Sequence, residues 1–144
     1  MAEVKTKATG ASVKSFFDAI PDEQVRKDCR EISRIMEAAT KSKPRMWGDK
    51  IVGFGSRKLR YANGKEVDWT IIAFAPRAKT IALYIGADTK AYEELKPTLG
   101  KHTGGGTSCL HIKRLADVHV PTLKKLVKSS VAYMTRSQTL GAKC

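Results

Sequence analysis

The dipeptide Asn63-Gly64 is the feature that most constrains the fold of this chain, because it lies between two stretches rich in strand-forming residues. Asn-Gly favours the type I′ turn of a two-residue β-hairpin, since both central residues of that turn need positive φ. Such a hairpin predicts four cross-strand pairs: Ala62 with Lys65, Tyr61 with Glu66, Arg60 with Val67, and Lys58 with Trp69. An antiparallel sheet is therefore expected in the middle of the chain.

Strand and helix patterns continue on both sides of this hairpin. Apolar or alternating residues predict strands over 51–54, 67–75, 80–85 and 108–113. Apolar residues at spacings of three and four predict helices over 12–19, from Pro21 to before Pro44, over 88–96 with a stop at Pro97, and from Pro121 onward. This order predicts an α+β fold: an antiparallel β-sheet of about five strands, covered on one face by N- and C-terminal helices.

The length of 144 residues suits a single domain. We expect that domain over 12–136, between a flexible basic tail at 1–11 and a flexible C-terminal tail at 137–144. The longest apolar run, 71–76, is too short to span a membrane, and the N-terminus lacks the apolar segment of a secretory signal. A cytoplasmic protein without membrane contact is therefore expected, and its three cysteines are predicted to be reduced thiols: Cys29, Cys109 and Cys144.

Positive charge dominates the composition, because 27 Lys and Arg stand against 14 Asp and Glu, for a formal net charge of +13. This potential favours anionic partners, so we predict a non-enzymatic binding module for a small anionic ligand or an acidic protein surface. Nucleic acid is a less favoured partner, since no helix-turn-helix, zinc-finger or RNP pattern is present. Lys124, Lys125 and Lys128 share the exposed side of the last predicted helix, where a solvated face is preferred over a phosphate-contacting stripe. A charge that serves only solubility is the alternative, and the oligomeric state stays open.

The segment from Gly100 to Ser108 is the best candidate for an anion site. Consecutive glycines allow backbone N–H groups to converge on one anion. The predicted ligand-binding residues are Lys101, Thr103, Gly104, Gly105 and Thr107. The segment is not a Walker loop, because its lysine follows the first glycine and it leads into a strand. A plain connecting loop is the alternative.

Aromatic residues suggest a second set of contacts near the hairpin. In the predicted register Trp69 faces Lys58, with Arg60 diagonal to it, which is a cation–π arrangement or a platform for a planar anion. We therefore predict Trp69, Arg60 and Tyr61 as neighbouring ligand contacts if the fold brings the hairpin close to the glycine segment. Trp47 is expected in a loop, and core packing is the alternative for both tryptophans.

No complete catalytic motif is present, so no catalytic residue, metal ligand or cofactor is assigned. A small enzyme is an alternative that would use His102 or His111 as an acid–base, although no partner residue is identifiable. Cys109 and His111 share one face of a predicted strand. With His102 they could form a metal site, but no fourth ligand with suitable spacing is present. As a nucleophile and base, Cys109 and His111 lack a third group that would orient them.

A combined pattern covers the chain from about Phe16 to Met134. Its segments are Met46-Trp47-Gly48, Ile51-Val52-Gly53-Phe54-Gly55, Tyr61-Ala62-Asn63-Gly64, Asp68-Trp69, Phe74-Ala75-Pro76-Arg77, Leu83-Tyr84-Ile85, Leu99-Gly100-Lys101-His102-Thr103-Gly104 and Cys109-Leu110-His111-Ile112-Lys113-Arg114-Leu115. Together these segments resemble the YdhG-like family of bacterial domains of unknown function. The resemblance implies a frataxin-like architecture, in which helices pack on one face of an antiparallel sheet.

One branch of that family is described as a frataxin-like intracellular iron chaperone, so the resemblance implies iron carriage as an alternative function. The acidic residues available for it are Asp22, Glu23, Asp28 and Glu31. Iron loading in frataxin-like proteins is associated with an acidic surface. Here six basic residues stand against six acidic ones over 16–44, so this chain departs from that pattern.

Overall fold

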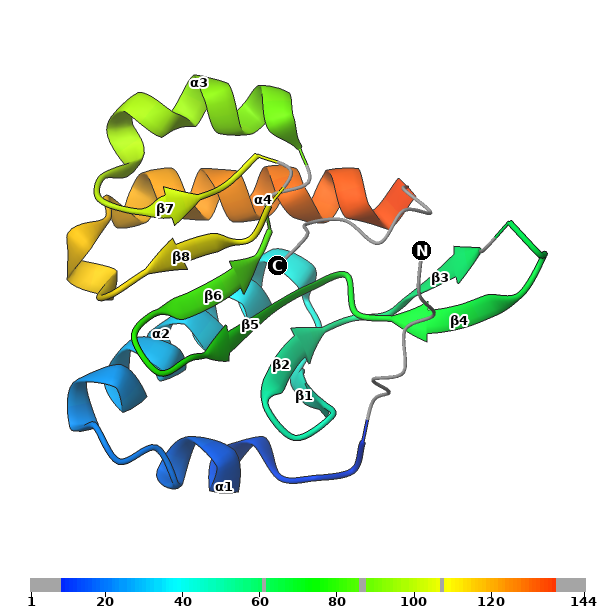
Figure 1. Cartoon of the computed structure of the whole chain (residues 1–144), viewed down its shortest axis with the longest axis horizontal. Helices are drawn as coiled ribbons and strands as arrows, with labels where there is room; N and C mark the ends of the chain where they lie inside the picture. Colours follow the sequence, from blue (N-terminus) through cyan, green and yellow to red (C-terminus); the bar gives the residue numbers. More distant parts are fainter. Residues whose placement is uncertain (1–8, 61, 86–87, 107, 137–144) are drawn as a thin grey trace.

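The computed structural model describes residues 9–60, 62–85, 88–106 and 108–136 (Figure 1). A six-stranded antiparallel sheet has the strand order β1-β2-β5-β6-β8-β7, and β3 and β4 form a separate two-stranded sheet. The elements are α1 (Val13–Asp18), α2 (Glu23–Thr40), β1 (Pro44–Trp47), β2 (Ile51–Phe54), β3 (Arg57–Arg60), β4 (Glu66–Trp69), β5 (Ile72–Pro76), β6 (Ile81–Tyr84), α3 (Thr89–Leu99), β7 (Thr103–Gly104), β8 (Leu110–Ile112), a 3-10 turn (Leu115–Asp117) and α4 (Val120–Arg136). The predicted α+β class and antiparallel sheet are confirmed, with more strands than expected.

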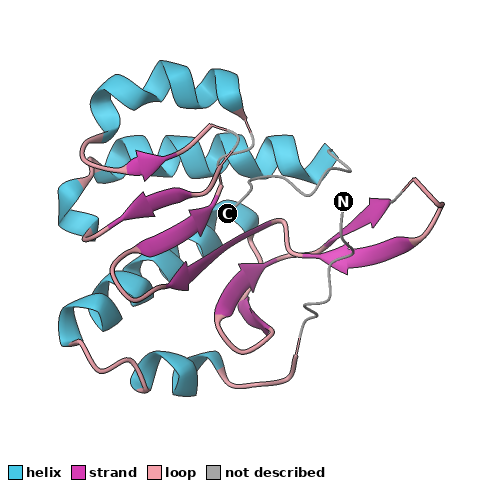
Figure 2. Cartoon of the chain, viewed as in Figure 1, coloured by secondary structure: helices cyan, strands magenta, loops and turns pink. Residues whose placement is uncertain are grey.

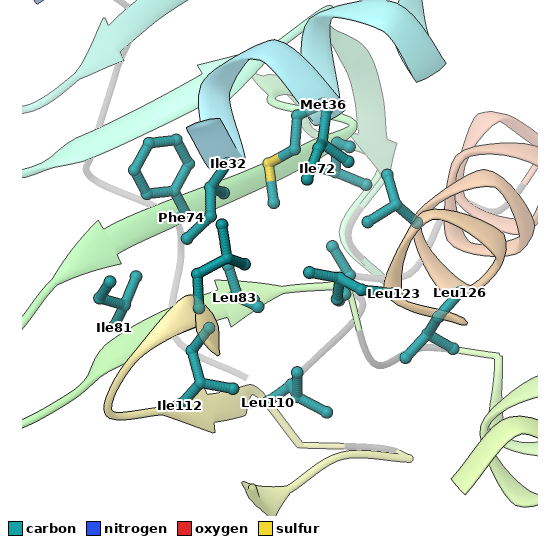
Figure 3. Packing of buried hydrophobic residues seen from close by; sticks show 14 of the residues in the cluster. Ile32, Met36, Ile72, Phe74, Ile81, Leu83, Leu110, Ile112, Leu123 and Leu126 are labelled. Carbon is teal, nitrogen blue, oxygen red and sulfur yellow. The ribbon is translucent and has the colours of Figure 1, made fainter. Parts of the chain in front are cut away.

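The main core lies between one face of the six-stranded sheet and the helices (Figures 1 and 2). Ile32 and Met36 of α2 point toward the strand residues Ile72 and Phe74, and Leu123 of α4 joins the same cluster (Figure 3). The apolar spacing predicted for α2 is confirmed: Cys29, Ile32 and Met36 are buried, and Val25 and Ala39 pack partly buried against them. No helix within the described ranges is long and apolar enough to cross a membrane.

The ends of α2 and α3 differ from the positions that Pro21 and Pro97 predicted. The Asp22 carboxylate caps α2 by accepting hydrogen bonds from the N–H groups of Gln24 and Val25 at 2.8 and 3.2 Å, so Pro21 lies outside the helix. The predicted stop at Pro97 is wrong, because α3 continues to Leu99. Pro97 lacks the N–H that would bond to the Glu93 carbonyl, and the helix ends two residues after it.

The strand predicted over 67–75 is split, and this is a correction to the sequence analysis. It forms β4 and β5, which belong to different sheets and are separated by Thr70 and Ile71. Phe54 still lies opposite Ile72, and Arg57 lies opposite Trp69, so the pairing register is the same on both sides of the break. The break therefore bends one continuous antiparallel ribbon, and the β3–β4 hairpin projects from the main sheet (Figure 2).

The predicted hairpin register is wrong by one residue. Arg60 lies opposite Glu66 instead of Val67, and Lys58 lies opposite Asp68, with which it forms an ion pair at 2.6 Å. Gly64 has a φ of 85°, but Asn63 does not have positive φ, so the turn is not type I′. The sequence Asn-Gly is also compatible with a hairpin loop that has an odd number of residues, in which only the glycine needs positive φ.

Two strands were missed. The first is the edge strand β1, which runs from Pro44 to Trp47. A proline at the first position of an edge strand costs no sheet hydrogen bond. Trp47 is therefore a buried strand residue, which corrects its expected place in a loop. The short β7 lies inside the glycine segment. Of the two predicted tails, residues 1–8 and 137–144 lie outside the described residues, while Thr9 donates a backbone hydrogen bond to the carbonyl of Met46.

Replacing Thr70 with valine is expected to lower the free energy of unfolding by about 1–3 kcal/mol. The Thr70 hydroxyl is buried at the bend of the ribbon, where it accepts a hydrogen bond from the Phe54 N–H at 2.9 Å and donates one to the Ile72 carbonyl at 2.6 Å. Valine keeps the shape but leaves that N–H without its acceptor. Urea unfolding measures the loss, and a Thr70→Ser variant, which keeps the hydroxyl, should retain more stability than Thr70→Val. Equal stability of valine and wild type would contradict this role.

Candidate functional site

The glycine segment lies at the β7 edge of the main sheet, where Thr103 pairs with His111. Gly104, Gly105 and Gly106 all have positive φ, so the conformational freedom expected of them is used. The N–H of Gly105 donates to the carbonyl of Cys109 at 3.2 Å, so it is engaged within the chain. This arrangement supplies fewer N–H groups to an anion than the sequence suggested.

A tyrosine and a histidine hold the segment against α3. The Nε2 of His102 lies 2.9 Å from the Tyr92 hydroxyl, and its Nδ1 lies 2.8 Å from the carbonyl oxygen of Gly100. The Tyr92 hydroxyl also donates to the carbonyl of Gly104 at 3.1 Å. A Cβ built on Gly105 would lie 2.3 Å from the Tyr92 ring, so only glycine fits beneath that ring. His102 thus has a clear structural role, which no local motif in the sequence signalled.

The predicted ligand residues do not come together. Lys101 and Thr103 are exposed at the β7 edge. Arg60 and Trp69 belong to the β3–β4 hairpin, and Trp69 packs on Trp47 of β1, the strand at the opposite edge of the main sheet. The condition that the hairpin lies close to the glycine segment is therefore not met. The predicted contacts Tyr61 and Thr107 lie outside the described residues.

Trp69 is a core residue rather than an open platform. It forms a small second core with Trp47 and Leu59, and its ring meets that of Trp47 edge to face with centroids 5.6 Å apart. The residue opposite Trp69 is Arg57, in place of the predicted Lys58. Burial lowers the pKa of Arg57 to about 10, so its guanidinium stays charged at neutral pH. The Nε1 of Trp47 is buried with no hydrogen-bond partner among the described residues.

The four acids considered for iron all have partners within the chain. Asp22 caps α2, Glu23 lies 3.4 Å from Lys27, and Glu31 lies 2.7 Å from Arg34. Asp28 is buried and accepts hydrogen bonds from Gln24, Arg114 and the backbone N–H of Leu115. Within the described part of the chain, no three His, Cys, Asp or Glu residues gather as a metal site would need.

The candidate acid–base and thiol groups lie near one another at the β7–β8 edge, where Thr103 pairs with His111, but the two histidines have different hydrogen-bond partners. His111 lies 3.4 Å from the Thr80 hydroxyl, and no carboxylate among the described residues hydrogen-bonds to either His111 or His102. Cys109 is disulfide-bonded, so the expectation of a reduced thiol is wrong for this residue. Cys29 is a free thiol, and burial, with a smaller contribution from Asp28, raises its pKa to about 12. Cys144 lies outside the described residues.

A groove between α2 and α4 combines positive charge with an apolar floor. Its volume is about 450 Å³, and its lining consists of Ile35, Ala38, Ala39, Lys124, Lys125 and Lys128. The floor comes from α2, where Ile35 is nearly buried and Ala38 is exposed. On α4 the apolar residues Leu123, Leu126 and Val127 are buried against the core, which leaves the neighbouring lysines on the open side.

The charge of this groove is unbalanced. Lys124, Lys125 and Lys128 are exposed and form no ion pair with any residue that the structure describes, and no acidic residue lines the groove. A neighbouring hollow that shares Ala38 adds Lys41 and Lys43 beside Glu37 and the Glu31-paired Arg34. The sequence pattern alone favours a solvated face for the three α4 lysines, because the α2 floor beside them forms only in the fold.

No protein-family model, curated protein or solved structure matches this chain. The resemblance to the YdhG-like family therefore stays a hypothesis that rests on the quoted segments.

Proposed function

We propose that this chain is a non-enzymatic binding module that holds an acidic, amphipathic segment of a partner protein in the α2–α4 groove. The observation that carries the proposal is the set of three lysines, none of them ion-paired with a described residue, beside an apolar floor formed by Ile35, Ala38 and Ala39. Lysine side chains attract carboxylates, and the floor buries apolar side chains of the same segment. A segment with both properties fits this groove better than a simple anion does.

The remaining candidates have weaker support. Anion binding by Lys101, Thr103, Gly104 and Gly105 stays a prediction, since the Gly105 N–H is already engaged. Iron carriage would require the α2 acids to exchange their present partners for the ion. Enzymatic use of His102 would require it to leave Tyr92 and the Gly100 carbonyl.

The test uses a fluorescent synthetic peptide of about 15 residues that carries a leucine stripe flanked by glutamates. Fluorescence anisotropy should show salt-sensitive binding to the wild-type chain. A peptide with glutamine in place of glutamate, and one with serine in place of leucine, should each bind more weakly. Equal binding of all three peptides would contradict the proposal.

A charge-matched pair of variants locates the site. Reversal of the groove lysines in Lys124→Glu, Lys125→Glu and Lys128→Glu should weaken peptide binding by roughly thirtyfold or more. The control reverses three exposed lysines elsewhere, in Lys79→Glu, Lys90→Glu and Lys113→Glu, and changes the net charge equally. Equal losses would show that binding follows total charge. Tighter binding of a DNA duplex than of the peptide, lost in the groove variant, would favour nucleic acid as the partner.

A further inference from the structure

A second hollow lies at one end of the main sheet, apart from the α2–α4 groove. Its volume is about 600 Å³, within the range of small-molecule sites. Three segments enclose it: the corner between α1 and α2, the β1–β2 turn at Lys50, and the β5–β6 turn from Pro76 to Ala78. Val25 is the residue of α2 that lines this hollow, and Ile35, the first groove residue on the same helix, lies 10 positions further along, or about 15 Å.

The walls of this end cleft are mostly apolar. The apolar lining residues are Phe16, Ala19, Ile20, Pro21, Val25, Pro76 and Ala78. Phe16, Ile20 and Val25 are partly buried and pack on the main core, so they form a fixed surface that an apolar group can cover. Such a surface favours a ring or a branched chain over a strongly hydrated ion.

Two cations reach the cleft from the two turns. Lys50 and Arg77 are exposed, and neither forms an ion pair with a described residue. The Arg77 guanidinium donates a hydrogen bond to the Tyr84 hydroxyl at 2.6 Å, and the Arg77 backbone N–H donates to the carbonyl of Thr80 at 2.7 Å. These two hydrogen bonds hold Arg77 on the β5–β6 hairpin, at the rim of the cleft.

One acidic residue also lines the cleft. Asp22 caps α2, and its Oδ1 accepts hydrogen bonds from the N–H groups of Gln24 and Val25. The positive end of the α2 dipole offsets its charge, so the two basic side chains are the groups still available to a ligand.

We infer that this end cleft binds a small carboxylate with an apolar body, such as an aryl-alkanoic acid. The apolar body lies against Phe16, Ile20 and Val25. The carboxylate accepts hydrogen bonds from Arg77 and Lys50 at the mouth. This site is independent of the proposed groove, because the two share no residue.

The test is an NMR titration of the full ¹⁵N-labelled chain with 3-phenylpropanoate. Two further probes separate the contributions: 3-phenylpropan-1-ol keeps the ring without the charge, and acetate keeps the charge without the ring. We expect 3-phenylpropanoate to shift the amides around Ile20, Lys50 and Arg77, and to bind on the order of fivefold more tightly than the other two probes. Equal affinity for the acid and the alcohol would overturn the assignment, as would shifts confined to other surfaces.

Single substitutions test whether Lys50 and Arg77 bind the carboxylate, with the nearby Lys79 as the control. Lys50→Met and Arg77→Met should each weaken 3-phenylpropanoate on the order of fivefold and leave 3-phenylpropan-1-ol unchanged. Lys79→Met removes an exposed lysine of the same β5–β6 turn that does not line the cleft, and it should have no effect. Tyr84→Phe removes the hydrogen-bond partner of the Arg77 guanidinium and should leave the affinity for 3-phenylpropan-1-ol unchanged. Losses of equal size in Lys79→Met and Arg77→Met would overturn the site.

Discussion

Replacing Gly53 with alanine is expected to lower the free energy of unfolding by about 3 kcal/mol, with a drop in Tm on the order of 10 °C. A Cβ at this position would lie 2.5 Å from the Thr70 hydroxyl oxygen and 2.5 Å from Cδ1 of Trp47. Both neighbours are buried, and Thr70 also bonds to Phe54 and Ile72, so neither can move without breaking other contacts. Thermal unfolding followed by circular dichroism measures the loss.

Gly10→Ala is the matched control for this substitution, because a Cβ there meets nothing within 4 Å. It should leave Tm within about a degree or two of the wild-type value. A Gly53→Ala protein as stable as the control would show that the β2 backbone shifts freely away from Trp47, which would contradict the close packing described for this face.

Replacing Asp28 with alanine is expected to cost about 2–4 kcal/mol of unfolding free energy. The carboxylate is buried and accepts a hydrogen bond from the Leu115 N–H at 3.1 Å, one from Gln24 Nε2 at 3.0 Å and one from Arg114 Nε at 3.3 Å. It thereby joins α2 to the 3-10 turn that precedes α4. Alanine leaves the buried Leu115 N–H without an acceptor, and the connection between the two segments is lost.

Glu31→Ala removes an acid from the same helix and serves as the control. Glu31 pairs with Arg34 on an exposed surface, so its loss should cost at most about 1 kcal/mol. Urea unfolding compares the two variants, and amide hydrogen exchange over 113–118 should accelerate in Asp28→Ala alone. Similar stability losses in the two variants would contradict the bridging role of Asp28.

Prediction from sequence succeeded where local chemistry decides the structure. The apolar stripe of α2 and the strand at Ile51–Phe54 are where their residue patterns placed them. Prediction from sequence failed where a contact between distant residues determines the local structure. The bend at Thr70 depends on a hydroxyl that reaches Phe54, 16 residues earlier, and the one-residue shift of the hairpin depends on loop geometry that Asn-Gly alone does not determine.

The candidate sites show the same division. The run of glycines predicted a segment whose backbone N–H groups converge on an anion, and Gly104 and Gly105 do adopt the positive φ that glycine favours. It could not show that the Gly105 N–H would be engaged by Cys109, since that bond depends on how the segment folds back on β8. The groove and the end cleft each combine residues from distant parts of the chain, such as Ala38 with Lys128 and Ile20 with Arg77. Neither pairing leaves a local sequence signal.

The edge-to-face contact between Trp47 and Trp69 also determines what an optical experiment sees. These are the only two tryptophans of the chain, and both are buried where the projecting hairpin meets the main sheet. Intrinsic tryptophan emission therefore monitors one small junction, while far-ultraviolet dichroism monitors the helices. If the hairpin detaches before the helical layer melts, the emission curve will move to lower denaturant than the dichroism curve. Neither Trp47 nor Trp69 lines the α2–α4 groove or the end cleft. A ligand bound at either site therefore needs its own fluorescent label to be detected by fluorescence.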